Sequence, residues 1–359
     1  MPSFLESLRG AVGDTLFYGA VSPAIKILVL LFLGVLPLIT YLVLIERKVL
    51  GYMQARVGPN RVGPWGILQP IADVMKLLVK EDTLPRQAVK WAFVLAPCLV
   101  VAPAFIIFSV IPIGPPAGEP GNLSWFIADV NAGLLFIVAL ATIGVYGLII
   151  GGWSSNNKFS LMGGLRSAAQ MISYEVPQGL SLVGPLLFAG TLSLVGIVEA
   201  QREQGVWFIF KFFPLGLIAF FIYLVAGVAE SNRNPFDLPE AESELVAGFH
   251  TEYSGMRFAL FFLGEYANMI VISAVATTLF LGGWLPPFPH WLPALGVIPG
   301  PIWFFLKMFV FLFAYIWFRG TFPRYRFDQL MDLGWKWMIP LALANIFAVG
   351  LWKLWKLLI

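Results

Sequence analysis

Long apolar runs recur along the whole chain, and they constrain its fold more than any other feature. A helix needs about 20 apolar residues to cross the hydrocarbon core of a bilayer. The eight runs that approach or exceed this length are 27–45, 91–113, 130–150, 166–190, 212–229, 257–284, 301–318 and 337–352. They predict an all-α polytopic membrane protein, with residues 1–359 forming a single domain of eight transmembrane helices.

The composition requires the same class of protein. Hydrophobic residues make up 59% of the 359 residues and charged residues only 12%, against about 25% charged in a soluble domain. The net charge of +3 is too small to indicate a nucleic-acid partner. One cysteine and two histidines are too few for an internal disulfide or an iron–sulfur cluster. We therefore expect no metal site in the chain and the lipid bilayer as its surroundings.

The basic residues are distributed unevenly between the loops. Sixteen of the 23 lie in alternate loops, beginning with the loop after the first run, while the other loops and the termini hold six. The remaining one, Lys307, lies inside a run. Because basic loops stay in the cytoplasm, this pattern places both termini on the outer face.

The first basic loop contains a shorter helical pattern over residues 67–80. Gln69, Asp73, Lys76 and Lys80 recur at three- and four-residue steps, with apolar residues between them. This stretch is too short and too charged to span a membrane. It predicts an amphipathic helix that lies along the inner interface or covers a cavity between spans.

Ionisable residues inside the membrane are costly and are therefore functional candidates. Glu175 and Glu265 lie at similar depths in their runs, while Asp129, Glu46 and Glu230 mark the ends of runs. The alternatives are structural hydrogen bonds for the first two and charges at the headgroup level for the others. The secondary candidates are Asp129, Tyr174, Tyr266 and Lys307.

The fifth loop carries a dense group of acids. These acids are Glu240, Glu242, Glu244 and Glu252. Carboxylates this close raise one another's pKa and can pass protons near pH 7. Together with Glu230, Glu175 and Glu265, they predict a proton path, or a polar cavity entered from the inner side. A solvated acidic loop remains the alternative.

Several motifs occur in an order that resembles one family. They are Glu46–Pro64 (ERKVLGYMQARVGPNRVGP), Leu68–Asp73 (LQPIAD), Lys80–Asp82 (KED), Gly152–Ser160 (GWSSNNKFS), Arg166–Glu175 (RSAAQMISYE), Asn234–Leu245 (NPFDLPEAESEL) and Arg324–Leu330 (RYRFDQL). Over roughly residues 26–350 the chain resembles the family of the H subunit of NADH-quinone oxidoreductase, the bacterial respiratory complex I. That family includes subunit 1 of the mitochondrial respiratory complex I.

The resemblance implies a role at the junction of two arms of a larger enzyme. With peripheral subunits, such a subunit forms the chamber through which quinone, ubiquinone or menaquinone, leaves the bilayer. NADH, flavin and iron–sulfur clusters belong to partner subunits, and neighbouring membrane-arm subunits are further partners. The residues that the resemblance places along or near this chamber are Glu46, Arg47, Gln54, Arg56, Arg61 and Asp73.

The same resemblance matches the acidic residues to the family's proton-coupling channel. One position departs from the pattern, because some members carry an acid where this chain has Thr142. A continuous carboxylate path through the third span is therefore in doubt. The sequence Gly58-Pro59-Asn60 favours the respiratory branch over the plastid and cyanobacterial branch.

Two other functions compete with this interpretation. The related anchor subunit of membrane-bound hydrogenases needs no quinone, and the Gly58-Pro59-Asn60 loop with the acidic fifth loop argues against it. A secondary transporter is least favoured, because inverted repeats and paired broken helices are missing. For location, chain length and the leader before the first run favour a bacterial plasma membrane over the mitochondrial inner membrane.

Overall fold

The protein folds as a set of packed helices. A computed structural model describes residues 22–116, 126–211, 213–238, 245–287 and 298–358, and within these ranges there are helices and connecting turns but no β-strand. The predicted all-α class is therefore confirmed for this part of the chain.

The helices vary in length from one turn to 32 residues. In the first half of the chain they are α3 (Ser22–Val29), η2 (Leu30–Val35), α4 (Leu36–Met53), η3 (Pro64–Gly66), α5 (Gln69–Val79), α6 (Lys90–Ile107), α7 (Gly133–Ser154) and α8 (Lys158–Ala189). In the second half they are α9 (Leu194–Gln204), α10 (Phe208–Lys211), α11 (Leu215–Glu230), η4 (Gly248–His250), α13 (Gly255–Phe280), α14 (Gly300–Thr321), α15 (Phe327–Asp332), η6 (Leu333–Met338) and α16 (Ile339–Leu358).

Each of the eight predicted spans overlaps a helix, but the helices do not all reach the length of a span. In the described residues, six are long and apolar enough alone, and α8 with α9 forms a seventh that bends by 56°. The helix α11 has only 16 residues, fewer than the ~20 that a straight crossing needs. The chain is thus a protein with several membrane-spanning helices, and the count of eight remains a prediction.

The predicted ends differ from the observed ones where polar groups decide them. The span predicted at 166–190 begins eight residues earlier, because Asn157 accepts a hydrogen bond from the Phe159 N–H at 2.9 Å and caps α8. The span predicted at 257–284 ends at Phe280, ahead of Gly282 and Gly283, which both have positive φ.

The predicted amphipathic stretch is a helix. The helix α5 covers Gln69–Val79, against the predicted 67–80, and packs against α4 and α13. Ile71, Met75 and Leu78 are exposed. The position of this helix along a membrane surface remains a prediction.

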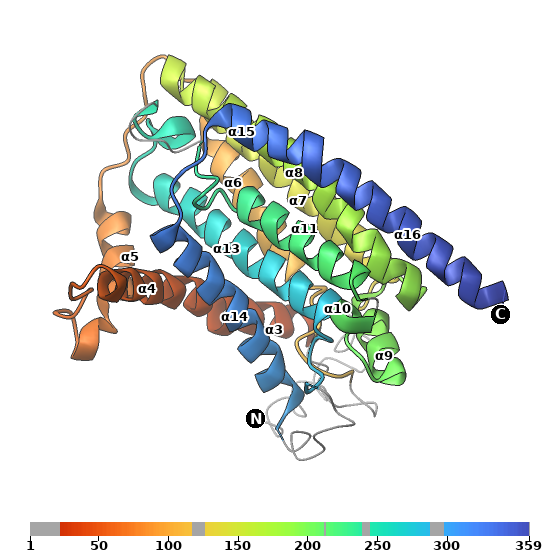
Figure 1. Cartoon of the computed structure of the whole chain (residues 1–359). Helices are drawn as coiled ribbons and strands as arrows, with labels where there is room; N and C mark the ends of the chain where they lie inside the picture. Colours follow the sequence, from red (N-terminus) through yellow and green to blue (C-terminus); the bar gives the residue numbers. More distant parts are fainter. Residues whose placement is uncertain (1–21, 117–125, 212, 239–244, 288–297, 359) are drawn as a thin grey trace.

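The bundle has one end that carries most of the basic loops. There α4, α7, α11 and α14 end, while α6, α8 and α13 begin (Figure 1). We call it the basic end. The helix α4 crosses the rest of the bundle at a steep angle, whereas α8 and α16 run side by side (Figure 1).

Small residues allow the central helices to approach closely. A Cβ atom at Gly152 of α7 would lie 2.6 Å from the carbonyl oxygen of Ser160 in α8. A Cβ atom at Gly163 of α8 would lie 2.6 Å from the Cα atom of Gly248. Glycines at these positions bring the η4 turn and the start of α8 into backbone contact, as in other membrane helix pairs.

Candidate functional site

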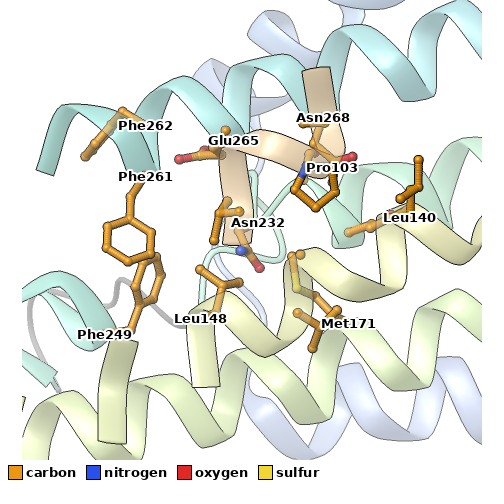
Figure 2. A pocket seen from close by; sticks show the side chains of 18 of the residues that line it. Pro103, Leu140, Leu148, Met171, Asn232, Phe249, Phe261, Phe262, Glu265 and Asn268 are labelled. Atoms are coloured by element: carbon orange, nitrogen blue, oxygen red, sulfur yellow. The ribbon is translucent and has the colours of Figure 1, made fainter. Parts of the chain in front are cut away.

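A small cavity lies between α6, α7, α8 and α13 and is closed by the loop after α11 (Figure 2). Its volume is ≈ 50 Å³, which is enough for a few water molecules. Three carboxylates from three different helices line it: Glu175 of α8, Glu230 of α11 and Glu265 of α13. We call it the carboxylate cavity. Three of the predicted proton-path residues thus meet in one place.

Glu175 is bound to the neighbouring helix α7. The hydroxyl of Thr142 donates a hydrogen bond to Glu175 Oε1 and is also 3.0 Å from the carbonyl oxygen of Val138. Thr142 is the position where some family members carry an acid. In this chain a hydroxyl therefore stands beside Glu175, and it can both donate and accept a hydrogen bond.

Glu230 is the last residue of α11 and is buried. It also lines a second cavity of ≈ 30 Å³, which it shares with Glu175, Gln178 and Asn268. Oε2 of Glu230 and Oε1 of Gln178 have no well-formed hydrogen bond to any residue in the described part of the chain. Buried oxygens of this kind are usually satisfied by water.

A charge cluster adjoins the carboxylate cavity. It consists of Glu46 from α4, Arg233 from the loop after α11, Glu265 and Tyr266 from α13, and Arg319 from α14. Arg233 Nη1 donates to Glu46 Oε1 at 3.1 Å, and its Nε lies 2.9 Å from Glu265 Oε1. The Tyr266 hydroxyl donates to Glu46 at 2.8 Å, and Arg319 is ion-paired with Glu46.

The cluster balances two cations against two carboxylates in a buried position. The side chains of Arg233 and Glu46 are each 4% exposed. Burial alone would lower the pKa of Arg233, but Glu265, Tyr266 and Glu46 around it raise that pKa well above its usual value. Arg233 therefore stays charged and holds the ends of α4 and α13 together.

A buried amide fixes the loop that presents Arg233. The fully buried Nε2 of Gln170 lies 2.8 Å from the carbonyl oxygens of Ala229 and Phe236 and 3.3 Å from Asn232 Oδ1. Sequence reasoning did not select Gln170 as a site residue. The rule that polar residues within membrane spans are functional candidates could have found it.

The same loop carries a second ion pair. Asp237 lies 2.9 Å from Arg324, in the connection between α14 and α15. Burial raises the pKa of Asp237 above its usual value, although Arg324 opposes this shift. This pair ties the loop after α11 to the last spans of the bundle.

The predicted chamber residues surround an open groove at the end of α4. The groove has a volume of ≈ 620 Å³, and Arg47, Arg56, Arg61 and Gln69 are among its lining residues. Its charged walls are held by polar contacts at its rim. Arg47 donates to Asp73 at 2.9 Å, and Arg56 donates to Gln54 at 2.7 Å. We call it the α4 groove.

Glu46 was expected at the chamber, and the structure places its side chain elsewhere. It is 3% exposed and belongs to the charge cluster, whereas its neighbour Arg47 lines the α4 groove. Consecutive helical residues differ by about 100° in direction. One turn of α4 thus contacts both the groove and the cluster.

The other candidates lie outside these sites. The Glu252 carboxylate accepts a hydrogen bond from Asn157 at 2.6 Å, and Asp129 accepts one from Ser193 at 2.7 Å. The Tyr174 hydroxyl donates to the Leu330 carbonyl at 2.8 Å. Glu240, Glu242 and Glu244 fall outside the described residues.

Lys307 makes a set of backbone contacts in the outer half of the bundle. Its ammonium lies 2.6 Å from the carbonyl oxygens of Leu281 and Leu285 and 2.9 Å from that of Gly283. These carbonyls follow the end of α13, where a cation is favoured by the helix dipole. This geometry supports a structural role at the end of α13.

His250 lies at the carboxylate cavity, which sequence reasoning did not predict. It is 7% exposed and is one of the residues that line the cavity. Burial lowers its pKa to about 4. No sequence signal distinguished it, because it lies in a loop and its only nearby acid in sequence, Glu252, turns toward α8. No three His, Cys, Asp or Glu side chains gather as a metal site in the described ranges.

Comparisons with known proteins agree with one another. The family model described as NADH dehydrogenase matches residues 25–350. A Magnetococcus marinus protein, named as the H subunit of NADH-quinone oxidoreductase, is 50% identical over 355 residues, covering 98% of each chain. A Geobacter sulfurreducens protein, named as a second copy of the same subunit, is 52% identical over 344 residues, covering 96% of this chain and 98% of its own. This chain belongs to the NADH dehydrogenase family.

Proposed function

We propose that the chain is a membrane-arm subunit of a proton-translocating NADH:quinone oxidoreductase. In this role the α4 groove forms part of the quinone chamber, together with peripheral subunits that carry the redox centres. The carboxylate cavity and the charge cluster form the path that couples quinone reduction to proton movement. The names of the bacterial relatives support the assignment and a bacterial plasma membrane as the location.

One observation supports this function more than any other. Glu46 and Arg47 are neighbours on α4, and one contacts the charge cluster while the other lines the α4 groove. The cluster in turn contains Glu265, which lines the carboxylate cavity. A charge change in the groove can therefore act on the cavity through direct contacts.

The chemistry of quinone makes this contact useful. Reduction of a quinone to a quinol takes up two electrons and two protons, so it changes the charge at the place where it occurs. Nearby charges shift the pKa of carboxylates, and this effect is strong where water is scarce. Quinone reduction beside Arg47 would thus alter the proton affinity of Glu46 and Glu265.

The groove has the dimensions and the charge for this ligand. Its ≈ 620 Å³ falls within the range of ordinary small-molecule sites. The arginines at its wall can donate hydrogen bonds to quinone oxygens, while Leu50 and Val57 supply apolar contacts. Arg61 and Gln69 complete the polar part of the lining.

A photoreactive quinone tests the chamber assignment in the assembled enzyme. We expect crosslinks within residues 47–69, and we expect them to be suppressed by excess unlabelled quinone. An Arg47→Ala variant should raise the apparent KM for quinone, because a donor to the quinone is lost. Crosslinking confined to the lipid-facing side of α14, with unchanged quinone kinetics in Arg47→Ala, would contradict the assignment.

A further inference from the structure

One end of the carboxylate cavity is aromatic. Phe249, Phe261 and Phe262 line it (Figure 2). They lie at the η4 turn and in the first turns of α13, which places them at the basic end of the bundle. With Phe258, which packs against Phe262 at 4.7 Å between ring centroids, we call these residues the aromatic collar.

His250 is embedded in this collar. Its ring centroid lies 5.0 Å from that of Phe249, 5.3 Å from that of Phe258 and 5.8 Å from that of Phe262, all with edge-to-face geometry. It also lines the cavity. Hydrocarbon constrictions of this type repel water, so a single polar ring within one strongly affects whether water passes.

The helix α13 relates His250 to Glu265. Phe258, Phe262 and Glu265 follow one another at four- and three-residue steps and thus share a helix face. At a rise of 1.5 Å per residue, Glu265 is ~5 Å from Phe262 and ~10 Å from Phe258 along the axis. His250 packs against both rings. Two or three water molecules would span the gap from its ring to Glu265 at ordinary hydrogen-bond lengths.

The other walls of the cavity offer water much less. Those contributed by α6 and α7 are hydrocarbon, including Val100, Pro103, Ile107 and Leu140. On the side of the charge cluster, Glu265 is ion-paired with Arg233. The collar is the part of the lining that continues directly into the loop after α11, which reaches the surface at exposed Val246.

We propose that His250 is the hydration gate of the carboxylate cavity, at which water from the basic end passes the aromatic collar and reaches Glu265. This inference rests on the proposed function. The imidazole acts as a neutral ring that donates one hydrogen bond to water and accepts another. Its pKa of about 4 agrees with this, since the ring then carries no charge at neutral pH.

Variants of His250 in the assembled enzyme test the gate. His250→Phe closes the collar with a ring of similar size, and His250→Leu does so with a smaller side chain if the first fails to assemble. His250→Asn keeps both a donor and an acceptor. Tyr253→Phe is the matched control, because Tyr253 belongs to the same aromatic group, stacked on Phe93 at 3.9 Å, but is not part of the cavity lining.

The readouts are inhibitor-sensitive NADH:quinone turnover, the quinone KM and the solvent deuterium isotope effect on turnover. NADH oxidation by a water-soluble acceptor serves as the measure of intact partner subunits. We expect His250→Phe and His250→Leu to lose most of their turnover at unchanged KM, with a larger isotope effect. His250→Asn and Tyr253→Phe should resemble the unaltered enzyme.

Two results would overturn the proposal. Normal turnover and isotope effect in assembled His250→Phe or His250→Leu would show that water does not pass at His250. An equal loss in His250→Asn would show that the imidazole itself is needed, as a proton carrier and not as a polar surface. Glu265→Gln separates this failure from that of the proposed function, because it should be impaired whether or not His250 is the gate.

Discussion

At the scale of single residues, Arg233 is the centre of the charge cluster. It contacts Glu46 and Glu265 and stacks on Tyr266 with its guanidinium carbon 4.3 Å from the ring centroid. Removing one partner of a buried pair leaves an uncompensated charge, which costs more than the pair contributes when intact. The cluster is therefore sensitive to loss of the arginine.

We expect Arg233→Met to destabilise the protein by about 3–5 kcal/mol. The matched control is Arg324→Met, because Arg324 forms a single pair whose side chain is 34% exposed and such pairs contribute about 0–1 kcal/mol. Thermal unfolding of the purified assembly measures both. Equal melting temperatures for the two variants would contradict the assigned role of Arg233.

His250 predicts how stability depends on pH. Its pKa is about 4 in the folded protein and 6.5 in a model compound. Between these values the unfolded chain binds more protons, so stability is complete above about pH 6.5 and falls as the pH drops toward 4. From pH 7.5 to pH 5, this single group should cost about 2 kcal/mol.

Melting temperatures at pH 7.5 and pH 5 test this for the unaltered protein and for His250→Asn. The difference between the two pH values should be smaller in His250→Asn, because asparagine does not titrate. An identical pH dependence in both proteins would show that His250 is not the group responsible.

At the scale of helices, the contact between α8 and the η4 turn depends on Gly163. Its missing side chain allows the backbone of Gly248 to approach, and this positions His250 two residues later. Gly179, on the same helix, has nothing within 4 Å of its Cβ position. The two glycines therefore provide a matched pair.

We expect Gly163→Ala to destabilise the assembly by about 1–3 kcal/mol through overpacking. Gly179→Ala should be neutral or stabilising by up to about 1 kcal/mol, since alanine favours the helix. Assembly on a native gel and thermal unfolding report both effects. A Gly163→Ala variant as stable as Gly179→Ala would mean that α8 and the η4 turn can move apart freely.

The sequence predicted the helices better than it predicted their ends. Hydropathy detects burial in lipid, so the eight apolar runs all overlap helices. It does not detect caps, which explains why the polar residues before Arg166 were missed as the start of α8. It also overestimated the length of α13, where Lys307 binds the carbonyls beyond Phe280.

The candidate site was predictable in its acids and not in their partners. Glu175, Glu230 and Glu265 stand out because carboxylates are rare in apolar runs. Arg233, Gln170 and His250 act through long-range contacts that a linear sequence does not contain. Glu46 lay near the correct region, but the direction of its side chain depends on how α4 crosses the bundle.

At the scale of the whole molecule, the α4 groove and the carboxylate cavity lie on two sides of one charge cluster. The cluster joins α4, α13 and α14 with the loop after α11. A rigid, contiguous connection of this kind lets a charge change on one side alter proton binding on the other. Glu265 belongs to both the cluster and the cavity lining, so we expect the coupling to depend on it.

The most direct measurement is inhibitor-sensitive quinone reduction in membranes that carry Glu265→Gln, with assembly checked on a native gel. Glutamine keeps the shape of the side chain and removes its titrating group. We expect an assembled enzyme with strongly reduced quinone turnover, while Glu203→Gln, which alters an exposed acid on α9, stays normal. Normal turnover in assembled Glu265→Gln would contradict the coupling path through this cavity.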